Sequence, residues 1–150
     1  MIAYADTSFL CAFYRQQDNS RQAVAHFQGL GEPLPVAAPL LFEFRQSLRF
    51  QVWLHSRKPG HGFSKAVCDQ ALADLQSDLD SGVLLLVSAD AATIHREAER
   101  ISATHTMTGG HRTLDILHIA TALVLKAEEF ISFDINQRKL AAAEGLKVKP

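Results

Sequence analysis

The stretch that decides the fold runs from Arg112 to Asp134 and reads RTLDILHIATALVLKAEEFISFD. Residues 114–127 within it are strongly apolar and long enough for a helix in the middle of the structure. Residues 130–134, FISFD, form a short apolar run, which is typical of a buried strand in a parallel sheet. A second such run, IAYAD at residues 2–6, opens the chain. Both runs finish on an aspartate, and parallel strands carry ligands at their carboxyl ends.

Strand-like and helix-like segments alternate between these two runs. We expect helices at residues 8–14, 20–30, 40–56, 64–79, 91–103, 114–127 and 138–144. Further strands are expected at residues 34–37, 84–87 and 146–148. Interleaved strands and helices of this length predict an α/β fold in which helices cover both faces of a parallel sheet of about five short strands.

The composition fits one globular domain over residues 1–150, with 47% hydrophobic and 21% charged residues. The net charge of -1 provides no overall basic field, so contact with nucleic acid would need a local patch. No apolar stretch reaches the roughly 18 to 20 residues that a membrane-spanning helix needs. Asp6 also interrupts the apolar start, unlike a signal peptide, so we expect a cytoplasmic protein without membrane contact. Cys11 and Cys68 lie far apart and predict buried thiols rather than zinc ligands or a disulfide.

Two further acids stand among large apolar side chains, unlike most acids of the chain. Glu43 lies near the start of the long helix at residues 40–56, and Asp115 begins the helix at residues 114–127. Each has an ordinary structural explanation: Glu43 could pair with Arg45 or Arg49, and Asp115 could favour a helix start. Those explanations are the simpler ones for each residue alone, but they do not account for four such acids together.

Four carboxylates that converge on one place repel each other unless cations neutralise them. The four acids are Asp6, Glu43, Asp115 and Asp134. All-oxygen sites suit Mg²⁺ or Mn²⁺, which polarises a phosphoryl oxygen and lowers the pKa of a bound water. The pattern therefore predicts metal-dependent phosphodiester hydrolysis, by one ion or two.

The order of these motifs is similar to that of the PIN-domain family, most of all to its VapC-type toxin ribonucleases. The resemblance starts at Asp6-Thr7-Ser8, passes through Glu43, is most specific from Arg112 to Asp134, and continues to Val148. It implies a PIN-like three-layer α/β/α fold and an Mg²⁺- or Mn²⁺-dependent endoribonuclease. It also implies an RNA substrate, a homodimer, and a small antitoxin that blocks the site.

The resemblance assigns both metal binding and catalysis to Asp6, Glu43, Asp115 and Asp134. Thr7 or Ser8 matches the hydroxyl residue of the family and is expected to support the carboxylate of Asp6. One position departs from the family: Gln46 stands where an asparagine is often found, and its longer amide can still orient Glu43 or a metal-bound water.

Basic residues near the acids are candidates for holding RNA. Arg112 precedes Asp115 by three residues, so its guanidinium could bind a phosphate or simply pair with a nearby acid. His118 lies one turn after Asp115 and is expected to be a satisfied core histidine rather than a member of the site. Apolar groups on the long helix, Trp53 among them, exceed what a core needs and predict a partner surface.

Three other functions are compatible with the same residues. A catalytically silent PIN-fold module would bind RNA or protein without hydrolysis. A non-toxic RNA-processing nuclease would share the chemistry. A phosphotransfer enzyme with Asp6 as nucleophile is disfavoured, because such enzymes commonly carry a second acid two residues on, where this chain has Ser8.

Overall fold

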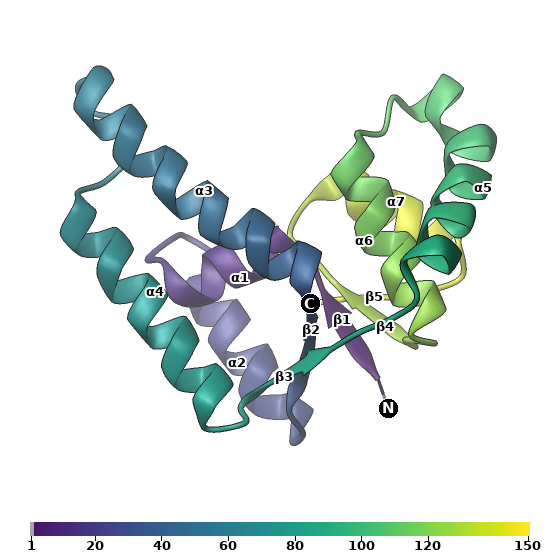
Figure 1. Cartoon of the computed structure of the whole chain (residues 1–150), viewed down its shortest axis with the longest axis horizontal. Coiled ribbons are helices and arrows are strands. Elements are labelled where there is room, and N and C mark those ends of the chain that lie inside the picture. The colour runs from purple at the N-terminus through teal and green to yellow at the C-terminus, as the bar shows by residue number, and fades with distance from the viewer. Residues whose placement is uncertain (1) are drawn as a thin grey trace.

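A computed structural model describes residues 2–150 of the chain (Figure 1). In order, the elements are β1 (Ala3–Ala5), α1 (Thr7–Tyr14), α2 (Ser20–Leu30), β2 (Leu34–Ala37), α3 (Ala38–Arg57), α4 (Lys65–Asp80), β3 (Leu84–Val87), α5 (Ala91–Gly109), α6 (Thr113–Val124), β4 (Glu129–Ile131), α7 (Ile135–Ala143) and β5 (Lys147–Lys149). The alternation of strands and helices confirms the α/β class.

The central sheet contains three parallel strands in the order β1-β4-β5, fewer than the sequence predicts. The strands β2 and β3 pair with each other in parallel and form a separate two-stranded ribbon. Pro35 in the middle of β2 lacks an N–H group, and proline is confined to edge strands for this reason. All five expected strands therefore exist, but ladder hydrogen bonds do not join them into one sheet.

Helices cover both faces of the strands, as expected for a three-layer arrangement. Figure 1 shows α1–α4 on one side and α5–α7 on the other. The core between them includes Tyr4, Phe9, Phe44 and Phe130, all fully buried. The prediction that the helix after Arg112 is central is confirmed, because seven of the twelve residues of α6 are buried.

Several helix bounds differ from the prediction: α3 is longer at both ends, and α6 ends at Val124 rather than residue 127. The helix α5 continues to Gly109 rather than residue 103, and Gly110 ends it in the left-handed conformation that glycine favours (φ 66°). The helix α7 begins at Ile135 rather than residue 138, because the side chain of Asp134 caps it. Cys11 and Cys68 are buried and unpaired, as expected. Among residues 2–150, no helix combines the length and apolar composition that crossing a membrane requires.

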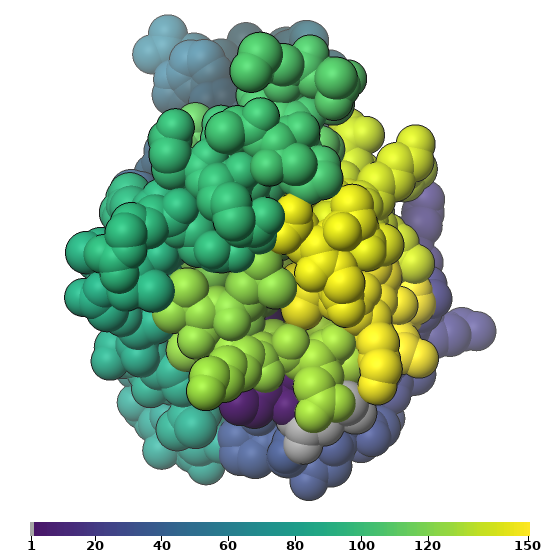
Figure 2. All heavy atoms as spheres, turned by 90° about the vertical axis from the view of Figure 1, so that its right-hand side faces the viewer, coloured from purple at the N-terminus to yellow at the C-terminus, as the bar shows by residue number. Residues whose placement is uncertain are grey.

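A cluster of charged groups joins α5 to the end of α7, and these segments lie side by side in Figure 2. The carboxylate of Glu144 accepts hydrogen bonds from Arg100 and, at 2.7 Å, from Nε2 of His105. The Glu144 side chain is only 8% exposed. The hydrogen bond from Arg100 is the main reason that the pKa of Glu144 lies below its usual value.

We expect Glu144→Gln to lower the free energy of unfolding by about 1–2 kcal/mol at neutral pH, because charge-assisted hydrogen bonds are lost. The loss stays this small because Arg100 is half-exposed and solvent screens its charge. A lowered folded-state pKa stabilises the protein above the ordinary glutamate pKa of about 4.3, and this contribution disappears as the pH falls through the folded-state value. Urea unfolding from neutral to acid pH checks both effects. The exposed Glu99→Gln is the control, and a pH-independent difference would contradict the assignment.

Candidate metal-binding site

The sheet brings the first and last of the four predicted acids to the same edge. Asp6 follows β1, Asp134 follows β4, and these strands are parallel neighbours with Ala5 opposite Ile131. The backbone N–H of Asp6 donates to the carbonyl oxygen of Ile131 at 3.0 Å, which extends the pairing by one residue. Both aspartates then cap the helix that follows them.

The carboxylate of Asp6 is fully buried and held by three donors. Its Oδ1 accepts from Oγ of Ser8 at 2.6 Å and from the backbone N–H of Phe9 at 3.1 Å. Its Oδ2 accepts from Oγ of Ser132 at 2.6 Å. Burial nevertheless raises the pKa of Asp6, because loss of hydration outweighs these hydrogen bonds. An ionised carboxylate at this place would therefore gain from a nearby cation.

Ser132 links Asp6 to Asp134. Its hydroxyl donates to Asp6 and accepts from the backbone N–H of Asp134 at 3.0 Å. Ser132 is fully buried within the apolar run before Asp134. The two aspartates are therefore tied together through one side chain.

Asp115 joins the same network from the first turn of α6, where it is 7% exposed. Its Oδ2 accepts from Nε of Arg112 at 3.1 Å, and its Oδ1 accepts from Nε2 of Gln137 at 3.3 Å. The backbone N–H of Gln137 donates to Oδ1 of Asp134 at 2.9 Å. Hydrogen bonds thus run without a break from Asp115 through Gln137 to Asp134.

Glu43 lies on α3 and is half-buried. Its carboxylate accepts from the hydroxyl of Thr7 and contacts Nε2 of His118. Burial acts to raise its pKa, but the hydrogen bonds from His118 and Thr7 prevail and hold the pKa of Glu43 below its usual value. The hydroxyl of Tyr4 lies 3.4 Å from Nδ1 of His118, so both ring nitrogens of His118 have a polar neighbour.

Three of the acids act electrostatically on Arg112, and one of them, Asp115, contacts it directly. The hydrogen bond to Asp115 is the largest effect that raises the pKa of Arg112, and the charges of Asp134 and Glu43 act in the same direction. The Arg112 side chain is 77% exposed, and only its Nε donates to Asp115. The rest of the guanidinium faces solvent beside the acids.

The supporting residues differ in where the structure places them. Ser8 supports Asp6 as expected, whereas Thr7 contacts Glu43 instead. Gln46 is exposed, and within residues 2–150 its side chain makes no hydrogen bond to Glu43. The possible contact of Gln46 with Glu43 is therefore not made in this structure, and Gln46 lies open to solvent.

Three residues near the acids have roles that differ from the sequence-based prediction: His118, Ser132 and Gln137. His118 is buried as a core histidine should be, but it also holds Glu43, and neither Arg45 nor Arg49 does so. Ser132 carried a usable signal, since it is polar inside an apolar strand run. Gln137 carried no such signal, because its contact with Asp115 depends on how α7 packs against α6.

The donor set fits a hard divalent cation, although the side chains are not closed around one position. Asp6, Glu43, Asp115 and Asp134 offer oxygen only, which Mg²⁺ and Mn²⁺ prefer. Among residues 2–150, no three acid, histidine or cysteine side chains lie close enough together to ligate one ion in this conformation. Ligation of one ion by three of these acids would therefore require their side chains to move closer together than in this conformation.

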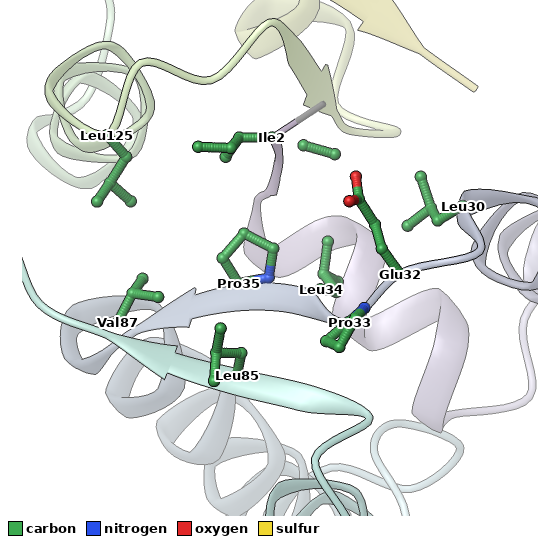
Figure 3. A pocket seen from close by; sticks show the side chains of 10 residues that line it. Ile2, Leu30, Glu32, Pro33, Leu34, Pro35, Leu85, Val87 and Leu125 are labelled. Atoms are coloured by element: carbon green, nitrogen blue, oxygen red, sulfur yellow. The ribbon is translucent and has the colours of Figure 1, made fainter.

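An apolar cavity of about 270 Å³ lies elsewhere, near the beginnings of β1 and β2 (Figure 3). Its lining includes Ile2, Pro33, Pro35, Leu85 and Leu125. None of the four acids lines this cavity, since they lie beyond the carboxyl ends of their strands. It offers no carboxylate cluster for metal chemistry.

Comparison with known proteins places the fold. The family model of the PIN domain matches residues 3–143. The structure is similar to that of the sarcin–ricin-loop-cleaving toxin VapC20 of Mycobacterium tuberculosis, with 16% identity, a TM-score of 0.68 and 99% of each chain covered. It is also similar to FitAcB from Neisseria gonorrhoeae, with 18% identity, a TM-score of 0.59, and coverage of 100% of this chain and 97% of that one. A search of curated proteins gives no significant match.

Proposed function

Because the chain belongs to the PIN-domain family, we propose that it is a metal-dependent endoribonuclease that hydrolyses phosphodiester bonds of RNA. One observation carries this proposal. A continuous hydrogen-bond network links Asp6, Asp134 and Asp115 beyond the carboxyl ends of the parallel strands. Helix capping explains part of this network, but burying the carboxylates of Asp6 and Asp115 is costly for folding and favours a functional role for them.

Asp6, Glu43, Asp115 and Asp134 would hold Mg²⁺ or Mn²⁺. When bound, the cation supplies Lewis-acid polarisation of the phosphoryl group and a water of lowered pKa. Ser8 and Ser132 keep both oxygens of Asp6 in a fixed orientation. Rigid carboxylates of this kind need little rearrangement when the substrate reacts.

Arg112 is the residue that we assign to substrate binding. Its exposed guanidinium has donors left over after the bond to Asp115. Arginine presents a planar fork that suits phosphate oxygens. A phosphate held there would lie next to Asp115.

The choice of RNA as substrate rests on the family and on the printed description of VapC20, a toxin that cleaves the sarcin–ricin loop. We also propose that this chain is the toxin of a toxin–antitoxin pair, that residues 1–150 form a single nuclease domain, and that it acts in the cytoplasm. A small antitoxin and a second copy of the chain are the proposed protein partners.

An aromatic stripe on α3 supports a protein partner. Phe42, Phe50 and Trp53 are 66%, 48% and 51% exposed, and the rings of Phe50 and Trp53 stack at 5.4 Å. Their spacing of eight and three residues keeps them near one face of the helix. Exposed apolar groups gathered in this way are typical of contact surfaces.

The proposal is tested by incubating the purified chain with end-labelled RNA that contains single-stranded loops. Cleavage should stop in EDTA and return with Mn²⁺ or Mg²⁺. Asp115→Asn should lower the rate by about 10²–10³-fold, because metal stabilisation of the transition state is worth several kcal/mol.

Asp80→Asn at the exposed end of α4 is the matched control and should leave the rate unchanged. RNA that is bound but left intact with either metal would contradict the nuclease and favour the silent module. Sequencing of RNA ends after induced expression identifies the cleaved site in the cell.

A further inference from the structure

Gln137 occupies a place in α7 where glutamine ordinarily has a local task. It is the third residue of the helix after the capping Asp134, and its backbone N–H donates to Oδ1 of that aspartate at 2.9 Å. In a capping box, the glutamine at this position returns its side chain to the backbone N–H of the cap residue. Here that N–H donates to Oγ of Ser132 instead, at 3.0 Å.

The side chain of Gln137 is thereby free to leave its own helix. Its Nε2 donates to Oδ1 of Asp115 on α6 at 3.3 Å. The opposite amide orientation would place Oε1 against a carboxylate oxygen, so the contact fixes which end faces Asp115. One residue therefore contacts two of the predicted metal ligands, one through its backbone and the other through its side chain.

The other polar atom of the Gln137 side chain, Oε1, is unfavourable for folding. Gln137 is 5% exposed, and its Oε1 is buried without a hydrogen-bond partner. A buried acceptor without a partner is unfavourable for folding, and such groups in native proteins call for an explanation. An apolar side chain of similar shape would avoid this loss, so stability alone does not explain a glutamine here.

We propose that Gln137 is a positioning residue that fixes the orientation of Asp115 relative to Asp134 for the binding of a divalent cation. This inference rests on the proposed function. Arg112 holds Oδ2 of Asp115, and Gln137 holds Oδ1, so the carboxylate has a donor on each side. Without the amide, Asp115 is anchored only by a side chain that is 77% exposed.

The test uses Gln137→Met, which keeps the length of the side chain and removes both polar ends. Affinity for Mn²⁺ is measured on the full chain by isothermal titration calorimetry, and thermal unfolding is measured in EDTA. We expect the Kd for Mn²⁺ to rise by about 10–100-fold, the effect typical of losing a partner of a metal ligand. The melting temperature in EDTA should change little, because the lost bond to Asp115 is offset by removal of the unpaired Oε1.

Gln76→Met on the exposed face of α4 is the matched control and should change neither quantity. If Gln137→Met fails to fold, Gln137→Asn supplies the same test, since its shorter amide does not reach Asp115. Unchanged Mn²⁺ affinity in the variant, beside a wild type that binds Mn²⁺, would overturn this inference and leave the proposed function standing. A wild type that does not bind Mn²⁺ would overturn both.

Discussion

Replacing Asp6 by asparagine is expected to abolish RNA cleavage and, in the absence of metal, to raise the melting temperature. The loss of a metal-binding carboxylate should lower the rate by about 10²–10³-fold or more, given several kcal/mol of lost transition-state stabilisation. Asparagine caps helices as well as aspartate does, so the bond from the N–H of Phe9 is retained. Cleavage assays and thermal unfolding in EDTA measure the two effects.

The gain in stability follows from the pKa of Asp6. Burial raises this pKa, so the folded state binds the proton more tightly than the unfolded state. Wild-type stability should therefore fall as the pH rises from the ordinary aspartate pKa of about 3.9 through the higher folded-state value. Asp6→Asn has no ionisable group at this position, so its free energy of unfolding should fall less than that of the wild type over the same pH range.

Asp90→Asn is a control of the same chemical change at another helix start. Asp90 caps α5 by accepting from the N–H of Thr93 at 2.8 Å, but it is exposed, and hydrogen bonds from Thr93 lower its pKa. This control should keep full cleavage and lose a little stability at neutral pH. Asp6→Asn would contradict our assignment if it cut RNA at the wild-type rate, or if Mn²⁺ raised its melting temperature as much as that of the wild type.

The sequence predicts the arrangement of elements well where apolar patterns are strong. The bounds of α2, β2 and β3 match the expected ranges. The extension of α5 was not predictable from periodicity, because residues 104–109 are mostly polar and the helix is held by packing against α6. The early start of α7 was hidden because Asp134 was interpreted only as a ligand, although it also caps the helix.

The candidate site is predictable in its acids but not in the contacts among them. Burial cost singles out Asp6 and Asp115 from the sequence alone, since each lies in apolar surroundings. The bonds from Ser132 to Asp6 and from His118 to Glu43 join residues 126 and 75 positions apart. Such contacts depend on how elements pack, and a single sequence does not contain that information.

The turn between α3 and α4 depends on Gly62, and Gly62→Ala is expected to cause the largest loss of stability. Gly62 has a φ of +67°, and a Cβ there would lie 2.0 Å from the carbonyl oxygen of Gln51 and 2.8 Å from the backbone nitrogen of His55. The left-handed conformation costs a non-glycine residue about 1–3 kcal/mol, and relieving the overlap adds about 1–3 kcal/mol. The turn cannot shift freely, because the N–H of Phe63 donates to the same carbonyl oxygen of Gln51 at 3.3 Å.

We therefore expect Gly62→Ala to lower the free energy of unfolding by about 2–5 kcal/mol, a large part of the 5–15 kcal/mol that holds a typical protein folded. Chemical denaturation measures this loss. Gly60→Ala in the same turn is the matched control, because Gly60 also has a positive φ (+77°) but a Cβ there meets nothing within 4 Å. Its loss should come from the backbone conformation alone, at about 1 kcal/mol. Equal losses in the two variants would show that the approach of Gly62 to α3 contributes nothing, and that the end of α3 can move to accommodate a side chain.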